Sequence, residues 1–150
     1  MEAIMTGRGG DALNGIGFGT WAWGNQLLWG YDAERDDRLL EETFRQALAS
    51  GLGLIDTADS YGTGRLNGRS EQLLGRFAAR LPATRRADLC IATKLAPFPW
   101  RLGRRGLDQA LQASRQRLQG HLRRVQLHWS TARYAPWQEV QLLDGLADRV

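Results

Sequence analysis

An acid and a phenol follow the same apolar segment, and both are residue types that take part in proton transfer. They lie between Gly53 and Gly62, where the chain passes from an apolar strand into an acidic loop. Asp56 ends the strand, and Tyr61 follows in the loop. The pair is a candidate catalytic site. The alternative is structural: Asp56 caps a turn and Tyr61 packs its ring on the loop.

A lysine in an arginine-rich chain is a second candidate. Of the 20 basic residues all but Lys94 are arginine, so the chain meets nearly every need for a surface cation with guanidinium. Lys94 lies in an apolar segment, residues 89–95, where a solvated cation would be out of place. Lysine differs from arginine in offering a compact charge that responds to burial. This favours a chemical role for Lys94 over that of an ordinary strand-end lysine.

Four repeats of strand, loop and helix must position these residues. The segments with the character of buried strands are 16–21, 52–56, 89–95 and 125–129. Mostly apolar residues at helical spacing, with Ser114 among them, follow each strand: Leu40, Phe44, Ala47 and Leu48; Leu74, Phe77, Ala78 and Leu81; Leu107, Ala110, Leu111, Ser114 and Leu118; Val140, Leu143 and Ala147. We expect Asp32 to cap the first helix and Pro82 to stop the second. The repeats predict an α/β fold of parallel strands joined by right-handed crossovers.

In such folds ligands gather at the carboxyl ends of the strands. Asp56, Lys94 and His128 are predicted at that end of the second, third and fourth strands. His128 taken by itself is better explained as a strand-end histidine satisfied by backbone groups, and only its position at the same edge as Asp56 and Lys94 favours a functional role. All six tryptophans lie in or beside the loops of the same face, which predicts an aromatic wall around the polar groups: Trp21, Trp23, Trp29, Trp100, Trp129 and Trp137.

Length and composition are those of one globular domain. The chain has 150 residues, 43% of them hydrophobic and 24% charged. We expect residues 1–14, rich in glycine, to form a flexible lead-in and residues 15–150 to form the domain. Cys90 has no second cysteine with which to form a disulfide or a metal cluster, so we predict no metal site and a reducing compartment. No apolar run has the length of a signal peptide or a membrane span, which predicts a cytoplasmic protein without a membrane partner.

The formal net charge of +4 raises the question of nucleic-acid binding. The arginines are spread over the predicted helices, and their pairs fall near element ends. They lack the stacking aromatics that single-strand binders interleave along a strand. The sequence therefore favours a solvated basic surface, and we expect no nucleic-acid partner.

Five motifs together resemble those of the aldo-keto reductases. In chain order they are Gly-Phe-Gly-Thr-Trp (17–21), Asp-Thr-Ala-Asp-Ser-Tyr-Gly (56–62), Gly-Arg-Ser-Glu (68–71), Ala-Thr-Lys (92–94) and Leu-His-Trp (127–129). The similarity runs from about residue 15 to the end. Two further segments, 21–24 and 99–103, are most similar to plant and cyanobacterial members. The resemblance implies a (β/α)8 barrel of the TIM type and an NADP-dependent oxidoreductase that reduces an aldehyde or ketone to an alcohol.

The resemblance also implies a role for each candidate residue. Tyr61 would be the general acid that protonates the carbonyl oxygen while hydride arrives from NADPH. An ammonium beside a phenol favours the phenolate, and a carboxylate keeps that ammonium charged; these roles fall to Lys94 and Asp56. His128 would orient the carbonyl of the small-molecule substrate.

The loops would supply the remaining contacts. The resemblance places Thr20, Trp21 and Asp56 against the cofactor. The tryptophan-rich loops would bind the apolar part of the substrate through Trp23, Trp100 and Trp129.

The chain departs from the family in supplying about four βα units, whereas the barrel has eight and takes about 250 residues. Half a barrel would expose strand edges and an uncovered interior face. We therefore expect a piece of a longer chain, a truncated product, or a homodimer that completes a barrel. Besides the reductase, a second hypothesis stays open: a non-catalytic remnant or a half-barrel module that assembles with another chain.

Overall fold

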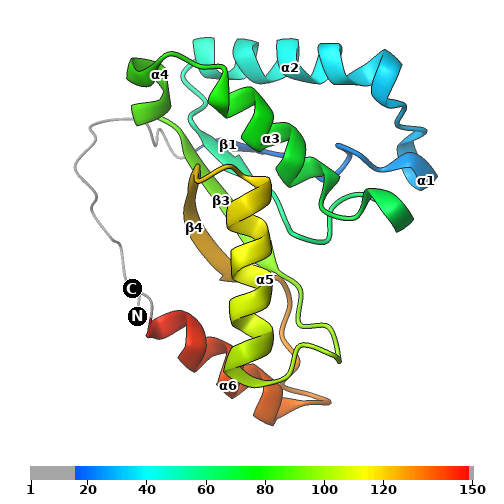
Figure 1. Cartoon of the computed structure of the whole chain (residues 1–150), viewed down its shortest axis with the longest axis vertical. Coiled ribbons are helices and arrows are strands. Elements are labelled where there is room, and N and C mark those ends of the chain that lie inside the picture. Colours follow the sequence, from blue (N-terminus) through cyan, green and yellow to red (C-terminus); the bar gives the residue numbers. More distant parts are fainter. Residues whose placement is uncertain (1–15, 149–150) are drawn as a thin grey trace.

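A computed structural model describes residues 16–148, which form a four-stranded parallel sheet with helices packed on it (Figure 1). The lead-in expected for residues 1–14 lies outside the described residues. The strands are β1 (Gly17–Gly19), β2 (Leu54–Asp56), β3 (Cys90–Leu95) and β4 (Leu122–Leu127). They lie in the order β1-β2-β3-β4, and each neighbouring pair is parallel. The α/β architecture predicted from the repeats is confirmed.

Helices connect and cover the strands. They are α1 (Gln26–Trp29), α2 (Ala33–Ala49), α3 (Arg69–Ala79), α4 (Ala83–Ala87), α5 (Gly103–Arg117) and α6 (Pro136–Ala147), with a 3-10 turn, η1, at Gly64–Leu66. Asp32 caps α2 as expected, because its side chain accepts hydrogen bonds from the amides of Glu34 and Arg35. The short helices α1 and α4 were not predicted from the sequence.

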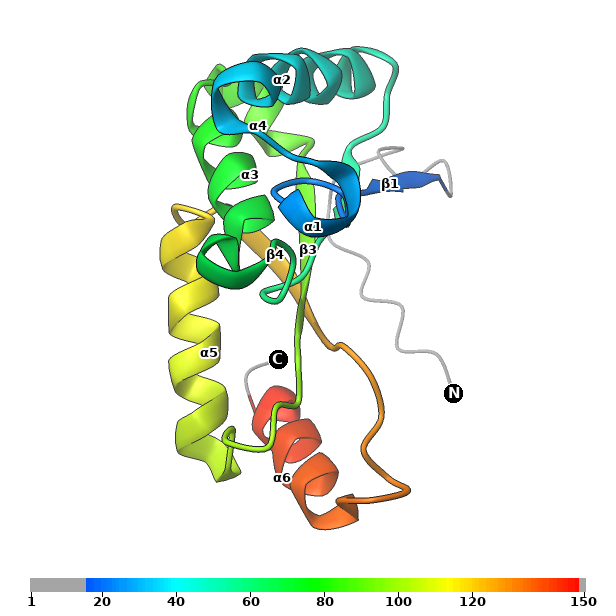
Figure 2. The same cartoon turned by 90° about the vertical axis from the view of Figure 1, so that its right-hand side faces the viewer.

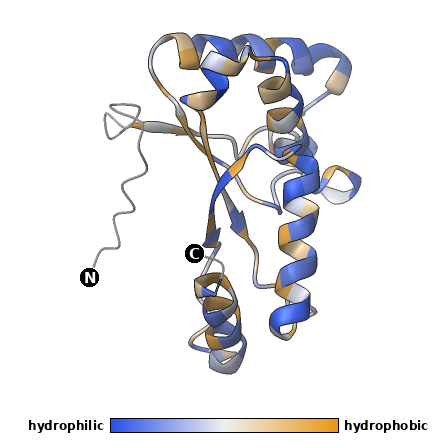
Figure 3. Ribbon diagram, turned by 60° about the vertical axis from the view of Figure 1, so that its left-hand side comes forward, coloured by the Kyte–Doolittle hydropathy of each residue, from blue (hydrophilic) through white to orange (hydrophobic). Residues whose placement is uncertain are grey.

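The helices lie mainly on one face of the sheet. In the view of Figure 2, α3 and α5 stand together to one side of β3 and β4. Figure 3 shows hydrophilic and hydrophobic residues alternating along α2 and α5, as expected of helices with one buried face. The main core fills the space between this helix layer and the sheet, and its fully buried members include Phe44, Ile55, Leu73, Leu74, Ile91 and Leu118.

The last helix corrects one prediction. We expected α6 to carry its apolar face at Val140, Leu143 and Ala147, but all three are exposed. Leu142 is buried instead, and it packs in a second core cluster with Leu95, Leu107 and Leu111. The helix contains apolar residues on more than one face, so its spacing did not decide which face is buried.

Register determines which side chains point away from the helices. Asp56 pairs with Ala92 of β3, and Lys94 lies two residues further along the same strand. Since side chains alternate along a strand, Asp56 and Lys94 share the face opposite to that of Ile55 and Ile91, whose side chains pack under the helices. The sheet thus places a carboxylate and an ammonium together on the face opposite to the one that packs under α3 and α5.

Candidate active site

Lys94 and Asp56 form an ion pair across the adjacent strands β2 and β3. Lys94 Nζ also donates a hydrogen bond to the carbonyl oxygen of Thr57 at 3.1 Å. The lysine side chain is 18% exposed and the aspartate side chain 44% exposed. The ammonium is therefore held at a fixed place with one side available to a further group.

Tyr61 supplies that further group. Its hydroxyl oxygen lies 3.4 Å from Lys94 Nζ, and the ammonium lies 5.3 Å from the centre of the phenol ring. The loop keeps this position because the amides of Thr57 and Asp59 bond to the carbonyls of Ala92 and Lys94 in β3. The loop thus continues the pairing of the sheet beyond the end of β2.

Two glycines allow the chain to turn tightly behind the tyrosine. Gly68 donates its amide hydrogen to the carbonyl of Tyr61 at 2.9 Å. Gly62 has a positive φ of 116°, and a Cβ at this position would lie 1.9 Å from the carbonyl oxygen of Leu66. A side chain at position 62 would therefore displace the loop that carries Tyr61.

His128 follows β4 and lies beside the phenol. Its amide bonds to the carbonyl of Leu95 at 3.0 Å, and its ring centre is 5.5 Å from that of Tyr61 in an edge-on arrangement. Burial lowers the pKa of His128, and the charge of Lys94 lowers it further against the opposing effect of Asp56. The ring is therefore neutral near pH 7. The structure thus brings together the four predicted catalytic residues.

Ser60 contacts the same histidine, and nothing in the sequence pointed to this residue beyond its place next to Tyr61. Its hydroxyl oxygen lies 3.1 Å from His128 Nδ1. This contact leaves Nε2 as the ring nitrogen available to a substrate. In a neutral ring whose Nδ1 accepts from Ser60, Nε2 carries the proton and can donate it in a hydrogen bond.

One of the three predicted substrate-binding tryptophans lies against the histidine, and a second is joined to it through Phe98. The ring centre of Trp129 is 4.9 Å from that of His128, and Phe98 contacts Trp129 at 5.9 Å. Trp100 stacks on Phe98 with ring centres 4.6 Å apart. Phe98 thus joins two tryptophans that are both exposed, and the three rings form an aromatic surface beside the polar groups.

Trp23 does not join this surface. Its ring is 7% exposed and packs in the main core, with its centre 6.0 Å from that of Phe18 and 6.1 Å from that of Phe77. Phe18 of β1 and Phe77 of α3 enclose the ring, so the structure gives Trp23 a place in the core and not on the surface predicted to contact the substrate.

The predicted cofactor residues differ in exposure. Thr20 is fully buried, and its hydroxyl donates to the backbone carbonyl of Asp56 at 3.1 Å and contacts Ser70 Oγ at 2.7 Å. Trp21 is exposed and packs edge-on against Trp29. A flat aromatic surface at Trp21 and a partly exposed carboxylate at Asp56 are groups that fit a nicotinamide nucleotide at this edge of the sheet. Thr20 is not available to a ligand, and its hydrogen bond to the backbone of Asp56 holds the end of β2 in place.

A buried acid fixes the loop that carries Phe98 and Trp100. Asp59 accepts the amide hydrogen of Ala96 at 3.1 Å and forms an ion pair with Arg101. Burial raises the pKa of Asp59, and the positive charge of Arg101 opposes that rise. The sequence showed the loop's aromatic content but not this ion pair, since its partners are 42 positions apart.

Within the part of the chain that the structure describes, no helix combines the length and apolar character needed to cross a membrane.

The parallel sheet, its crossover helices and the polar groups at its carboxyl edge define part of a (β/α)8 barrel of the TIM type. A putative aldo-keto reductase from Pseudomonas aeruginosa superposes with a TM-score of 0.67 at 24% identity, over 88% of this chain and 49% of the other. At this identity the similarity shows the fold alone.

The chain belongs to the aldo/keto reductase family, whose sequence model matches residues 15–148. It is 53% identical over 138 residues to the chloroplastic pyridoxal reductase of Arabidopsis thaliana, across 90% of this chain and 38% of that protein. It is 33% identical over 137 residues to the aldo-keto reductase YhdN of Bacillus subtilis, across 86% of this chain and 38% of the relative. The chain therefore spans about two fifths of the length of these relatives.

Proposed function

We propose that this chain carries the proton-transfer residues of an NADPH-dependent reductase that converts an aldehyde or ketone to an alcohol. The observation that carries the proposal is the position of Lys94 Nζ, which contacts both the Asp56 carboxylate and the Tyr61 hydroxyl, with His128 alongside. The family membership supports the same reaction class.

Each side chain has a task that its geometry permits. The Tyr61 hydroxyl donates its proton to the carbonyl oxygen of the substrate. The Lys94 ammonium, 3.4 Å from that hydroxyl, stabilises the negative charge that remains on the phenolate. Asp56 keeps the ammonium charged and in place. His128 Nε2 donates a hydrogen bond to the same carbonyl oxygen and fixes its direction.

A nicotinamide nucleotide would supply the hydride that the carbonyl carbon receives. Trp21 and Asp56 are the residues of this chain that would contact it. The preference for NADPH over NADH is itself a proposal, because relatives of this chain are not uniform in their cofactor. An Escherichia coli relative, 33% identical over 94 residues, is named an NADH-specific methylglyoxal reductase.

The substrate class follows from the aromatic surface and the relatives. Trp129 lies beside His128, and Phe98 and Trp100 extend its flat apolar surface, which suits a small carbonyl compound with an apolar or aromatic part. Pyridoxal and methylglyoxal, which occur in the names of two relatives, are aldehydes and are suitable first substrates.

The test is Tyr61→Phe, assayed by oxidation of NADPH and of NADH with each aldehyde in a protein that carries this segment at full length. We expect carbonyl reduction to fall by about 10²–10⁴-fold, because the general acid is lost. Cofactor affinity should be nearly unchanged. Tyr31→Phe removes a phenol that contacts Asp37 and Arg69, away from Lys94, and turnover should survive it. Turnover retained by Tyr61→Phe would refute the assignment.

A second candidate function is a non-catalytic half-barrel module that assembles with another chain or with a second copy of itself. The observation that favours it is that α3 and α5 both stand on one side of the sheet (Figure 2), as expected of part of a barrel wall. Titration of the 150-residue chain with NADPH, followed by tryptophan fluorescence, separates the candidates. Saturable quenching at micromolar cofactor would count against the non-catalytic module.

We propose that the binding partner of this chain is a small-molecule carbonyl compound, and that it binds neither nucleic acid nor a membrane. A cytoplasmic location stays a prediction, and the plant relative is named as chloroplastic.

A further inference from the structure

A pocket of about 400 Å³ lies on the helix layer, lined by residues of α3 and of the carboxyl end of α5. These helices cover the face of the sheet opposite to that of Asp56 and Lys94, so the pocket is separate from the candidate active site. The lining consists of arginine and glutamine side chains: Arg69, Gln72, Arg76, Gln116, Arg117 and Gln119.

Helical spacing brings these side chains together. Arg69, Gln72 and Arg76 lie at positions i, i+3 and i+7 of α3 and therefore share one face of that helix. Helix α5 approaches α3 closely beside this face. A Cβ added at Gly75 of α3 would lie 2.2 Å from the carbonyl oxygen of Arg117, the last residue of α5. The close approach places the end of α5 beside the arginines of α3.

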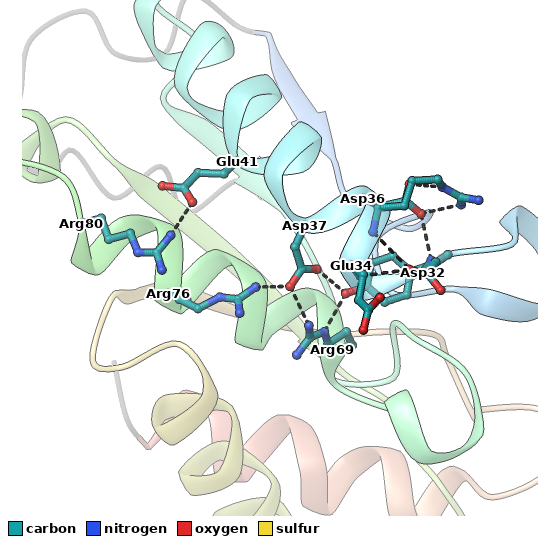
Figure 4. A network of polar contacts seen from close by, with 10 residues as sticks. Asp32, Glu34, Asp36, Asp37, Glu41, Arg69, Arg76 and Arg80 are labelled. Atoms are coloured by element: carbon teal, nitrogen blue, oxygen red, sulfur yellow. Dashed lines mark hydrogen bonds and ion pairs between the residues drawn. The ribbon is translucent and has the colours of Figure 1, made fainter.

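Carboxylates outside the lining hold the three guanidinium groups in place. Asp37 of α2 accepts hydrogen bonds from Arg69 at 2.9 Å and from Arg76 at 2.6 Å (Figure 4). Fully buried Glu71 accepts from Arg117 Nε at 2.6 Å. Three cations thus face two carboxylates, and ordering the guanidinium groups in advance lowers the entropic cost of binding an anion.

The arginines keep donors for a ligand. A guanidinium has five N–H donors. Among the described residues, hydrogen bonds engage Nε and Nη2 of both Arg69 and Arg117, but only Nη2 of Arg76. The glutamine amides add neutral donors. The pocket therefore combines a surplus of positive charge with many N–H groups.

We propose that this pocket binds a small phosphate-bearing anion. Guanidinium groups recognise phosphate through paired N–H donors, and three of them around one pocket suit a ligand with more than one anionic group. The volume accommodates a small phosphorylated metabolite or a diphosphate. The site lies behind the sheet, so such a ligand would bind without competing with a carbonyl substrate.

Inorganic pyrophosphate is the probe, titrated calorimetrically into the 150-residue chain at constant ionic strength, with inorganic phosphate and sulfate in parallel. We expect saturable binding, tightest for pyrophosphate. Gln116→Glu adds a negative charge to the pocket without breaking an ion pair, and it should weaken binding by about tenfold. Gln109→Glu is the matched control, because it makes the same exchange at an exposed position of α5 about 10 Å along the helix. It should leave the affinity nearly unchanged.

A second variant tests the charge directly. Arg76→Gln removes one guanidinium while Asp37 keeps Arg69 and the Tyr31 hydroxyl as partners, so the fold should survive, as circular dichroism would show. We expect weaker pyrophosphate binding and a smaller dependence of affinity on salt. Absence of saturable binding, or equal weakening by Gln116→Glu and Gln109→Glu, would overturn the proposal.

Discussion

Lys94 contacts both of its proposed partners through one nitrogen atom, an arrangement that the resemblance to the family implied. The strand pattern by itself predicted only that Asp56, Lys94 and His128 lie at one edge, because the carboxyl ends of parallel strands share it. Burial was harder to predict. Trp23 and Thr20 lie in the same kind of loop as Trp21, and only the packing of β1 against α3 decides which of them is enclosed.

The contact of Ser60 with His128 predicts a change in histidine ionisation. In Ser60→Ala the ring loses a hydroxyl that, as donor to Nδ1, stabilises the neutral form. We expect the pKa of His128 to rise toward the ordinary value from its lowered position. The measurement is a titration of the two histidine rings by NMR in the folded chain.

His121 is the internal control for that titration. It precedes β4, whereas His128 follows the strand's other end. Burial together with Arg86 and Arg123 lowers the pKa of His121 independently of Ser60. A pKa of His128 that stays the same or falls in Ser60→Ala would show that the hydroxyl is not a donor to the ring.

At the scale of elements, the strands and the long helices followed from apolar periodicity, whereas α1 and α4 did not. These helices have 4 and 5 residues, too few for a periodic pattern to appear. The prediction of which face of α6 is buried was wrong for a different reason. Leu142 and Leu143 are adjacent apolar residues, and only the position of α5 decides which one is buried.

The contact between α3 and α5 depends on a glycine. At Gly75 an added Cβ would lie 2.2 Å from the carbonyl oxygen of Arg117 and 2.9 Å from the Cα of Leu118, and both are backbone atoms that cannot turn aside. Gly75→Ala should therefore force the helices apart. We expect the free energy of unfolding to fall by about 1–3 kcal/mol, measured by urea denaturation.

Gly19→Ala is the matched exchange for that experiment, because an added Cβ there meets nothing within 4 Å. Its free energy of unfolding should stay within about 0.5 kcal/mol of the original. Similar losses in the two variants would mean that the close approach of α3 and α5 does not limit stability. The same contact supports the arginine pocket, so Gly75→Ala should also weaken pyrophosphate binding.

At the scale of the whole molecule, the sheet has two edge strands, and exposed apolar side chains lie near both. Ile16, Leu27 and Leu28 are exposed around β1 and α1, and Trp137, Val140 and Leu143 are exposed on α6, which packs on β4. Clusters of this kind beside unpaired strand edges promote association between chains. This arrangement is what a half-barrel that pairs with a second copy would need.

The self-association proposal predicts a concentration-dependent mass. In size-exclusion chromatography with light scattering, the 150-residue chain should exceed its monomer mass of 16.8 kDa increasingly as its concentration rises. Leu143→Lys places a charge on the exposed face of α6 and should return the mass toward that of the monomer. Leu39→Lys makes the same exchange at an exposed position of α2, a helix that packs on α3, and should leave the mass unchanged. A monomer at every concentration would exclude the homodimer, because the exposed side chains would then be tolerated in water without a partner.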